Sequence, residues 1–252
     1  MVVDRLHRTA RIVGPDEKGP LLPLAEGGST RSFIGGVILN QLGWASALGL
    51  RTGIFGKQGD DEPGRVLRAA MDRAGIEHHL TLDGSASSVA EIFLDASGER
   101  AIYFDPAATA ELTAAEVRAR HADFLRRGAR LTTEVHQVPL AAVAEALRIA
   151  RASGLATVGD LDVPPSDAVP VLGDEATFQA VLGLADLLKP SKRAARELAG
   201  AGEVDARELA RRQRRRFGNL AVVVTDGAVG CAVSSDEFEG VVPAPRVEMV
   251  DA

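Results

Sequence analysis

Leu140–Asp162, LAAVAEALRIARASGLATVGDLD, encodes a helix followed by a strand. In its first half, apolar residues recur at the spacing of one helix face, which predicts a helix over Leu140–Ala152 that ends at Gly154. In its second half, the apolar run Leu155–Val158 predicts a buried strand, and two aspartates follow it closely. A helix that leads directly into a buried strand is typical of an α/β fold with a parallel sheet.

The same alternation recurs along the rest of the chain, so we expect one α/β domain over residues 1–252. The clearest helix start is Asp61, which can cap a helix that has Pro63 in its first turn and ends at Gly75. The clearest strand is Leu220–Thr225, which suits the centre of a parallel sheet. The remaining predicted elements are helices over about 36–48 and 191–199 and strands over 51–55 and 185–188.

Two stretches break this alternation, about residues 8–34 and 80–105. The first is rich in glycine and proline and has no helical stripe. In the second, alternating residues flank Asp95–Gly98, a turn that suits a β-hairpin with Gly98 in a left-handed conformation. We therefore expect the two stretches to form a small β lid that projects from the α/β body.

Composition indicates an ordinary globular protein. Of the 252 residues, 46% are hydrophobic and 25% are charged, and the formal net charge of −6 gives no global attraction to nucleic acid or anionic membranes. The single cysteine, Cys231, cannot form an internal disulfide, and no apolar run is long enough to span a membrane. We expect a cytoplasmic protein. The basic run Arg211–Arg216 is interpreted as an exposed helix end, with RNA contact as the alternative.

Four carboxylates lie where a predicted strand ends or turns: Asp4, Glu134, Asp160 and Asp162. Ligands of open α/β sheets bind beyond the carboxyl ends of the strands. Carboxylates at that edge can accept hydrogen bonds from sugar hydroxyls or hold a metal ion, and the alternative is that each caps a helix or lies in a solvated turn. The five histidines lack metal-ligand spacing, so we expect none of them to bind a metal.

Two adjacent glycines precede the first predicted helix. Gly35 and Gly36 would let a ligand approach the backbone at the start of that helix, and Asn40 lies one turn into it. Lys57, in the turn before Asp61, could contact an anionic substrate group. The alternatives are a tight strand-to-helix turn, a surface asparagine and a solvated lysine. The glycine pattern is not Gly-x-Gly-x-x-Gly, which argues against a dinucleotide-binding oxidoreductase.

A second glycine pattern, Thr-x-Gly-x-x-Gly, follows the clearest strand at Thr225, Gly227 and Gly230. A threonine at a strand end with two glycines can form a backbone cradle for phosphate or a nucleotide. The alternative is a plain turn with glycines in left-handed conformations. No lysine of the kind found in P-loops follows, which argues against a P-loop NTPase.

Taken in order, these motifs resemble the ribokinase/PfkB family of carbohydrate kinases over nearly the whole chain. Val2–Arg5 is similar to the end of the family's first strand, whose aspartate binds a sugar hydroxyl, and Gly35-Gly36 with Asn40 is similar to its N-terminal signature. The other matching segments are Gly56–Gly64 (Gly-x-x-Gly-x-Asp-x-x-Gly), Gly98–Arg100 (a lid strand), Glu134 with Pro139 (the substrate side) and Thr225–Gly230 (the nucleotide-side loop).

The resemblance implies a three-layer α/β/α sandwich with a mostly parallel sheet (ribokinase-like), plus a small β lid that often carries a homodimer contact. It also implies transfer of the γ-phosphoryl group of ATP, with Mg²⁺, to a sugar or related alcohol. The residues that it assigns to the substrate are Asp4, Gly35, Gly36, Asn40, Lys57 and Glu134, and those that it assigns to the nucleotide are Ser191, Thr225, Gly227 and Gly230.

Three departures from the family pattern affect the expected chemistry. The family's Asn-x-x-Glu, which organises Mg²⁺ and phosphate, reads Ser191–Ala194 here, so Asp162 becomes the candidate metal residue. The family's Asp-Thr-x-Gly-Ala-Gly-Asp, which carries the anion hole and the catalytic aspartate, has a counterpart only in Asp251, so the catalytic aspartate is expected beyond Ala252. Little chain precedes Asp4, so we expect a first strand that is short or clipped.

These departures predict a truncated or degraded kinase-like chain, incomplete at its C-terminus, that holds no catalytic residue of its own. We expect very weak phosphoryl transfer, an exposed sheet face and self-association. The alternative is a non-catalytic sugar- or nucleotide-binding module with a regulatory role.

Overall fold

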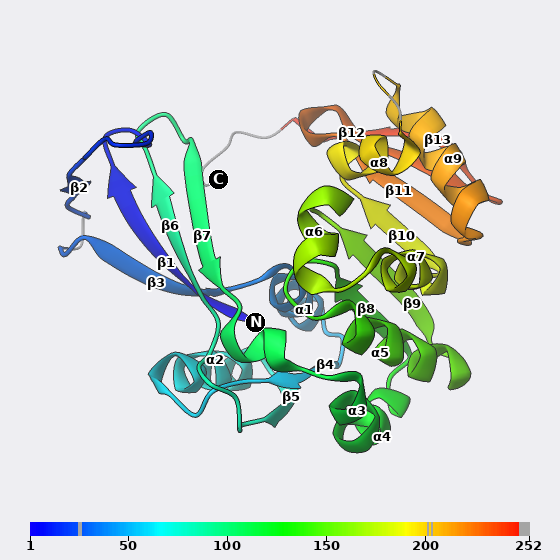
Figure 1. The fold of residues 1–252 in the computed structure, drawn as a ribbon, viewed down its shortest axis with the longest axis horizontal. Coiled ribbons are helices and arrows are strands. Elements are labelled where there is room, and N and C mark those ends of the chain that lie inside the picture. Colours follow the sequence, from blue (N-terminus) through cyan, green and yellow to red (C-terminus); the bar gives the residue numbers. More distant parts are fainter. Residues whose placement is uncertain (25–26, 201, 203, 247–252) are drawn as a thin grey trace. The chain divides into compact units, whose positions relative to one another are not determined.

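The computed structural model describes residues 1–24, 27–200, 202 and 204–246, which fall into two units (Figure 1). Unit 1 comprises the described residues up to Glu111, and unit 2 comprises those from Leu112 onward. The described strands of unit 1 form two sheets, and those of unit 2 form one six-stranded sheet.

The larger sheet of unit 1 is built around β1 (Val2–Thr9). On one side, β1 pairs antiparallel with β3 (Thr30–Gly35) and, near its end, with the short β2 (Leu21–Leu22). On the other side it pairs parallel with β6 (Val89–Leu94), which pairs antiparallel with β7 (Arg100–Asp105). The sheet is drawn from distant segments of the chain: β3, β6 and β7 lie in or next to the two stretches expected to form the β lid, and β1 lies mostly before the first of them. That this sheet serves as a lid stays a prediction.

The hairpin predicted around Asp95–Gly98 is confirmed. Gly98 joins β6 to β7 with a φ of 88°. The Asp95 carboxylate accepts hydrogen bonds from the backbone N–H of Ser97 (2.9 Å) and of Glu99 (3.1 Å). The first residue of the turn therefore holds the turn closed.

The prediction of a short first strand that ends near Asp4 is wrong. β1 continues past Asp4 to Thr9, because Asp4–His7 have backbone partners on both sides, in β3 and in β6. Asp4 thus lies within a strand that is paired on both sides rather than at the end of a strand.

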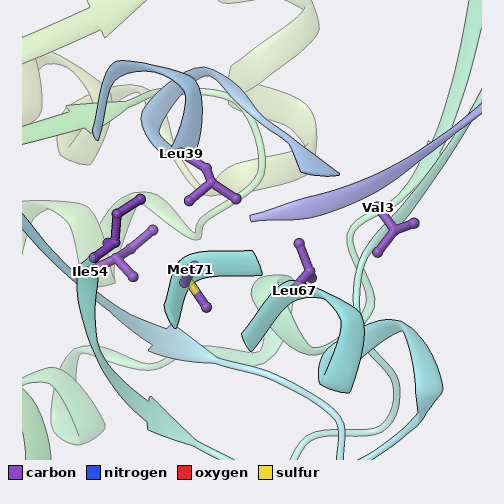
Figure 2. Packing of buried hydrophobic residues seen from close by; sticks show 6 residues of the cluster. Val3, Leu39, Ile54, Leu67 and Met71 are labelled. Atoms are coloured by element: carbon purple, nitrogen blue, oxygen red, sulfur yellow. The ribbon is translucent and has the colours of Figure 1, made fainter. Parts of the chain in front are cut away.

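The smaller sheet of unit 1 is a parallel pair, β4 (Thr52–Lys57) and β5 (Ile76–Thr81), and the predicted strand over 51–55 corresponds to β4. Helix α1 (Val37–Ala47) and helix α2 (Glu62–Arg73) both contact it, and both are close to their predicted bounds. A 3-10 turn, η1 (Ala107–Glu111), ends the unit. Helices α1 and α2 and strands β4 and β5 share a buried core with β1, which consists of Val3, Leu39, Ile54, Leu67, Met71 and Ile76 (Figure 2).

Asp61 caps α2 as predicted, and it also ties the helix to a distant segment. Its carboxylate accepts hydrogen bonds from the N–H of Gly64 (2.9 Å) and from the N–H (2.8 Å) and hydroxyl (2.6 Å) of Ser87. Burial acts to raise the pKa of Asp61, but these hydrogen bonds outweigh it and hold the pKa below its ordinary value. A Cβ at Gly59 would lie 2.8 Å from the backbone of Ala86, so the glycine here is required for this close packing.

The sheet of unit 2 has the strand order β13-β12-β11-β10-β9-β8. The four strands β8 to β11 are parallel and follow chain order, and β12 and β13 continue the sheet antiparallel. Their bounds are β8 (Arg130–Glu134), β9 (Ala156–Leu161), β10 (Leu187–Pro190), β11 (Ala221–Thr225), β12 (Gly230–Ser235) and β13 (Glu239–Pro243).

Two strand predictions for unit 2 need correction. The run Leu220–Thr225 forms β11, but it is parallel only to β10, because the chain turns back after Thr225 and places the antiparallel β12 on its other side. The strand predicted over Ala185–Leu188 begins at Leu187 instead. Asp186 is anchored just before it, since its carboxylate accepts a hydrogen bond from the N–H of Thr157 (2.8 Å).

The helices of unit 2 pack in one layer. α5 contacts α7, α7 contacts α9, and α9 contacts α8, while these helices also contact strands of the sheet. Right-handed crossovers between parallel strands taken in chain order place all their helices on the same face. The bounds are α3 (Ala114–Glu116), η2 (Val117–His121), α4 (Ala122–Arg126), α5 (Leu140–Ala152), α6 (Pro165–Leu172), α7 (Glu175–Leu184), α8 (Lys192–Ala199), α9 (Ala206–Phe217) and the 3-10 turn η3 (Gly227–Val229).

The two faces of this sheet differ in burial. Val222 and Val224 are both 0% exposed, whereas Val223, between them, points to the opposite face and is only half-buried. Val233 of β12, opposite Val223, is half-buried as well. Within the described part of unit 2, the contacts among the helices thus account for one of the two expected helical layers, and on the other face Val223 and Val233 form a partly buried apolar pair.

The basic run on α9 is paired within the protein. Arg211 forms ion pairs with Glu239 and Glu208, and Arg212 pairs with Glu208 at 2.8 Å. Arg214 pairs with Asp236. These pairs favour the interpretation of an exposed, salt-bridged helix end over an RNA-binding surface. Over the residues that the structure describes, no helix has the length and apolarity to cross a membrane.

Candidate functional site

In unit 1, the predicted residues Asp4, Gly35 and Gly36 lie together. Asp4 of β1 is directed at the end of β3, where a Cβ at Gly35 would lie 2.7 Å from the Cγ of Asp4. Gly36 follows with a φ of 97° and caps α1. Burial raises the pKa of Asp4, and the positively charged N-terminus partly opposes that effect. A half-buried carboxylate thus lies against bare backbone.

Asn40 lies in the first turn of α1, where its N–H donates to the Gly36 carbonyl at 3.0 Å. Its side chain is exposed and lines a hollow of about 290 Å³, which does not include Asp4. The other lining residues are Ile34, Leu39, Gly43, Trp44, Ala74 and Ile76. These surroundings are mostly apolar. The backbone of Asn40 is thus tied to Gly36, but its side chain lines a hollow that is separate from the Asp4 carboxylate.

Lys57 ends β4 and has acidic neighbours within unit 1. Its ammonium lies 3.5 Å from an Asp83 carboxylate oxygen and 3.9 Å from a Glu111 carboxylate oxygen, and its side chain is only 13% exposed. The structure therefore brings Lys57 to these two carboxylates, and contact with an anionic substrate group stays a prediction.

In unit 2, the parallel strands bring Glu134, Asp160 and Lys189 side by side at their carboxyl ends. Glu134 is the register partner of Asp160, and Asp160 is the register partner of Lys189. The Lys189 ammonium donates to the Asp160 carboxylate at 2.8 Å. Glu134 is 7% exposed, and its Oε2 has no hydrogen-bond partner among the described residues. A buried oxygen of this kind is suited to a hydroxyl or ammonium donor of a ligand.

Burial raises the pKa of Glu134, and the neighbouring carboxylates of Asp160 and Asp162 raise it further. Burial lowers the pKa of His136, two residues along the chain, and the negative charge of Asp162 partly opposes that effect. The surroundings at the end of β8 therefore favour the uncharged forms of Glu134 and His136. Asp160, unlike Glu134, has a positively charged partner at short range, the ammonium of Lys189.

Asp162 and Ser191 meet at the next turn of the chain. The Ser191 hydroxyl donates to the Asp162 carbonyl oxygen (3.0 Å) and accepts from the N–H of Ala194 (3.2 Å), so Ser191 caps α8. The Asp162 side chain is exposed. In the described ranges of the chain, no group of three or more His, Cys, Asp or Glu side chains is arranged to hold a metal ion. The assignment of Asp162 to a metal stays a prediction.

The Thr-x-Gly-x-x-Gly loop joins β11 to β12, and its two glycines are needed for different reasons. Thr225 forms a parallel bridge with Ser191, which places the two predicted nucleotide-side segments next to each other. At Gly227 (φ 53°) a Cβ would meet open space. At Gly230 (φ 113°) it would lie 2.6 Å from the backbone nitrogen of Ala244. Of the two glycines, Gly227 therefore borders open space, whereas Gly230 is needed for the close approach of the chain at Ala244.

The last two residues of the chain, Asp251 and Ala252, lie outside the described residues. The match of Asp251 to the first aspartate of the family's C-terminal signature therefore has no structural test here. The expectation that the family's catalytic aspartate lies beyond Ala252, and that this chain holds no catalytic residue of its own, likewise stays a prediction.

The candidate residues within the described ranges form local groups inside each unit. Two lysines that no sequence motif indicated, Lys189 and Lys192, also belong to these groups. Lys189 ends β10 next to Asp160, and Lys192 pairs with Asp226 in the glycine loop. The sequence does show a lysine on each side of the Pro190-Ser191 pair at a strand end. It could not show the acidic partners of these lysines, because both partners come from distant segments of the chain.

Comparison with known proteins gives one consistent family. A family model described as pfkB family carbohydrate kinase matches residues 9–252. Fructokinase-2 of rice (Oryza sativa subsp. japonica) is 30% identical to this chain in an alignment 255 positions long, which covers 94% of this chain and 71% of the rice protein.

Solved structures agree on the fold. The crystal structure of a protein called Sa239 superposes with a TM-score of 0.81 at 22% identity and covers 100% of this chain and 78% of that one. Ribokinase of Thermotoga maritima superposes with a TM-score of 0.77 at 18% identity, over 99% of this chain and 77% of that one. The predicted ribokinase-like α/β fold class is confirmed.

Proposed function

Because this chain belongs to the pfkB family of carbohydrate kinases, we propose that it binds a sugar and serves ATP-dependent phosphoryl transfer to one of the sugar's hydroxyl groups. The observation that carries the proposal is Glu134, a buried carboxyl at the carboxyl end of a parallel strand with one oxygen unpartnered among the described residues. Ligands of open α/β sheets bind at that end of the strands, and a sugar hydroxyl supplies the missing donor.

The proposed substrate is a small free sugar. Relatives of this chain are named fructokinase and ribokinase, so D-fructose and D-ribose are the first candidates. On the substrate side we assign Asp4, Gly35, Gly36, Asn40 and Lys57 together with Glu134. Within unit 1, this assignment gives the Asp4 carboxylate a sugar hydroxyl to bind, and the bare backbone at Gly35 and Gly36 would let a sugar approach closely. Within unit 2, it gives the Glu134 carboxyl a sugar hydroxyl to bind.

The proposed nucleotide side consists of Ser191, Thr225, Gly227 and Gly230. Its fit to ATP is supported by the open space at Gly227 and by the first-turn amides of α8, which follow Ser191. Mg²⁺ bound with nucleotides takes most of its ligands from phosphate oxygens and water, so one exposed carboxylate, that of Asp162, is enough to contact its shell. When bound, the ion would neutralise phosphate charge.

For the 252-residue polypeptide by itself we propose slow phosphoryl transfer. Its sequence contains no Gly-Ala-Gly-Asp, the motif that supplies the family's anion hole and catalytic aspartate. Loss of a single anion-hole donor costs about 10²–10³ in turnover in other enzymes. The alternative proposal is therefore a non-catalytic sugar- or nucleotide-binding module. A homodimer contact through the β lid is a further expectation of the family assignment, and the cytoplasmic location expected from the composition stays a proposal.

Calorimetry and a coupled kinase assay test these proposals together. The protein is titrated with D-fructose and D-ribose, then with MgATP, and turnover is measured with both present. Sugar and MgATP binding with slow turnover supports an impaired kinase, and sugar binding without MgATP binding supports the module. Turnover at an ordinary kinase rate, roughly 1–100 per second, contradicts the proposed impairment. The Glu134→Gln variant is titrated in the same way and should bind sugar more weakly than the wild type. A wild type that binds neither sugar contradicts the sugar site.

A further inference from the structure

Lys192 lies where the two predicted nucleotide-side segments meet. It is the first residue of α8, and its ammonium contacts the Asp226 carboxylate at 2.6 Å in the loop between β11 and β12. The side chains of Lys192 and Asp226 are 28% and 21% exposed. Both line a hollow of about 170 Å³ that also contains Asp205 and Arg207 at the start of α9 and is otherwise apolar. The Lys192 ammonium is therefore accessible from this hollow.

A positively charged lysine at the first position of a helix is electrostatically unfavourable for the helix itself. The N-terminus of a helix carries partial positive charge, which favours acidic residues in the first turn, yet α8 has none there. The neighbouring Arg193 is directed elsewhere, since it is 76% exposed and pairs with Asp167. Asp226 offsets the charge of Lys192 in this state. An anionic ligand at the same corner would be attracted by both the ammonium and the helix start.

The glycine loop does not depend on Lys192 for its shape. Within the loop, the N–H of Asp226 donates to the Gly230 carbonyl at 2.8 Å, and the N–H of Val229 donates to the Asp226 carbonyl at 3.1 Å. The bridge between Ser191 and Thr225 joins the loop to the start of α8 independently of these side chains. The ion pair is thus additional to a backbone that is already held.

From these contacts we infer that Lys192 binds the phosphates of the nucleotide and that Asp226 orients its ammonium until the nucleotide arrives. This inference rests on the proposed function. It adds a positively charged residue close to Ala194, which stands where the family pattern has a glutamate. A lysine ammonium acts on phosphate as a compact point charge with three donors.

Nucleotide binding by two variants tests this role. Lys192→Met should weaken ATP binding by about tenfold or more, the range expected for one charged hydrogen bond, and should leave adenosine binding unchanged because adenosine has no phosphate. Arg193→Met is the matched control, since it removes the adjacent exposed cation, and it should leave ATP binding as in the wild type. Equal ATP affinity of the Lys192→Met variant and the wild type overturns the inference.

Asp226→Asn separates phosphate binding from a structural latch. If Lys192 binds phosphate, this variant keeps or improves ATP affinity, because a negative charge is removed from the corner and the ammonium is released. If the pair is only a latch, Asp226→Asn and Lys192→Met lose ATP affinity equally and the double variant loses no more, which overturns the inference. A wild-type protein that binds sugar but neither ATP nor adenosine contradicts the proposed nucleotide function itself, whereas the other outcomes bear on Lys192 alone.

Discussion

The Asp4 carboxylate occupies the space that a side chain at Gly35 would need. An ideal Cβ at Gly35 would lie 2.7 Å from the Asp4 Cγ and would overlap one of its carboxylate oxygens. The two residues belong to β1 and β3, whose antiparallel register sets Asp4 opposite Phe33 and Gly35 opposite Val2. The glycine is therefore required by its strand neighbour, and the carboxylate keeps its position only while the glycine remains.

Gly35→Ala should lower the free energy of unfolding by about 1–3 kcal/mol, because the new methyl group must displace the Asp4 side chain or the strand. Urea denaturation measures the change. Gly43→Ala is the control: in helix α1 a Cβ there meets open space, and the change should stabilise by about 0.5–1 kcal/mol. Adding Asp4→Ala to Gly35→Ala should recover most of the lost stability. If the double variant instead loses as much unfolding free energy as the two single variants combined, the contact between these residues is contradicted.

Glu134 should make stability depend on pH in a defined direction. Burial and the carboxylates of Asp160 and Asp162 raise the pKa of Glu134 above its ordinary 4.5, so the folded state holds this proton more tightly than the unfolded state. Its favourable contribution is complete below pH 4.5 and is lost as the pH rises through the raised pKa.

The comparison with Glu134→Gln isolates this effect, because the amide has the same shape and does not titrate. From about pH 4 to pH 8, the stability of the wild type relative to that of Glu134→Gln should fall, as followed by urea denaturation at each pH. A difference that is flat or that rises with pH would show that Glu134 is not the buried, proton-retaining group described above.

Gly230→Ala should destabilise the protein more than Gly227→Ala. Both glycines have positive φ, which costs a non-glycine residue about 1–2 kcal/mol. At Gly230 the added Cβ also meets the backbone at Val242–Ala244, whereas at Gly227 it meets nothing within 4 Å. Thermal unfolding of the two variants checks the order, and equal losses would contradict the close approach of β13 at Gly230.

The partly buried apolar pair Val223 and Val233 on the unit 2 sheet should bind the dye ANS and promote association of the protein with itself. Val233→Asp places a charge on that face and should reduce both the ANS fluorescence and the concentration dependence of sedimentation. Val171→Asp makes the same change at a residue of α6 that is 75% exposed, and it should alter neither. Wild-type ANS fluorescence at background level would rule out an accessible apolar face.

Local features of the sequence predicted the local features of the fold. The bounds of α5 agree with the stripe of apolar residues in Leu140–Ala152, and Asp61, Pro63 and Gly75 mark the start and end of α2 where their capping roles place them. These predictions hold because a cap, a turn glycine and a helical stripe act on residues a few positions away.

Pairing between distant strands could not be predicted in the same way. Asp4 was expected at a strand end, yet partners in β3 and β6 extend β1 to Thr9. The Asp61 carboxylate also binds Ser87, and nothing in the helix-capping pattern identifies that second partner. Apolar alternation indicates that a residue lies in a strand, but it does not say which strand lies beside it.

By itself, the amino-acid sequence determined the fold class and the residue types available for chemistry: carboxylates after strands, glycines before helices and a threonine-glycine loop. Only the tertiary structure decided which of them meet, for example that Lys189 neutralises Asp160 while the adjacent Glu134 keeps a buried oxygen without a partner among the described residues. The reason is physical: propensity and periodicity act over a few residues, whereas the charge and hydrogen bonding of a buried group are set by neighbours that only the register of separate strands brings within reach.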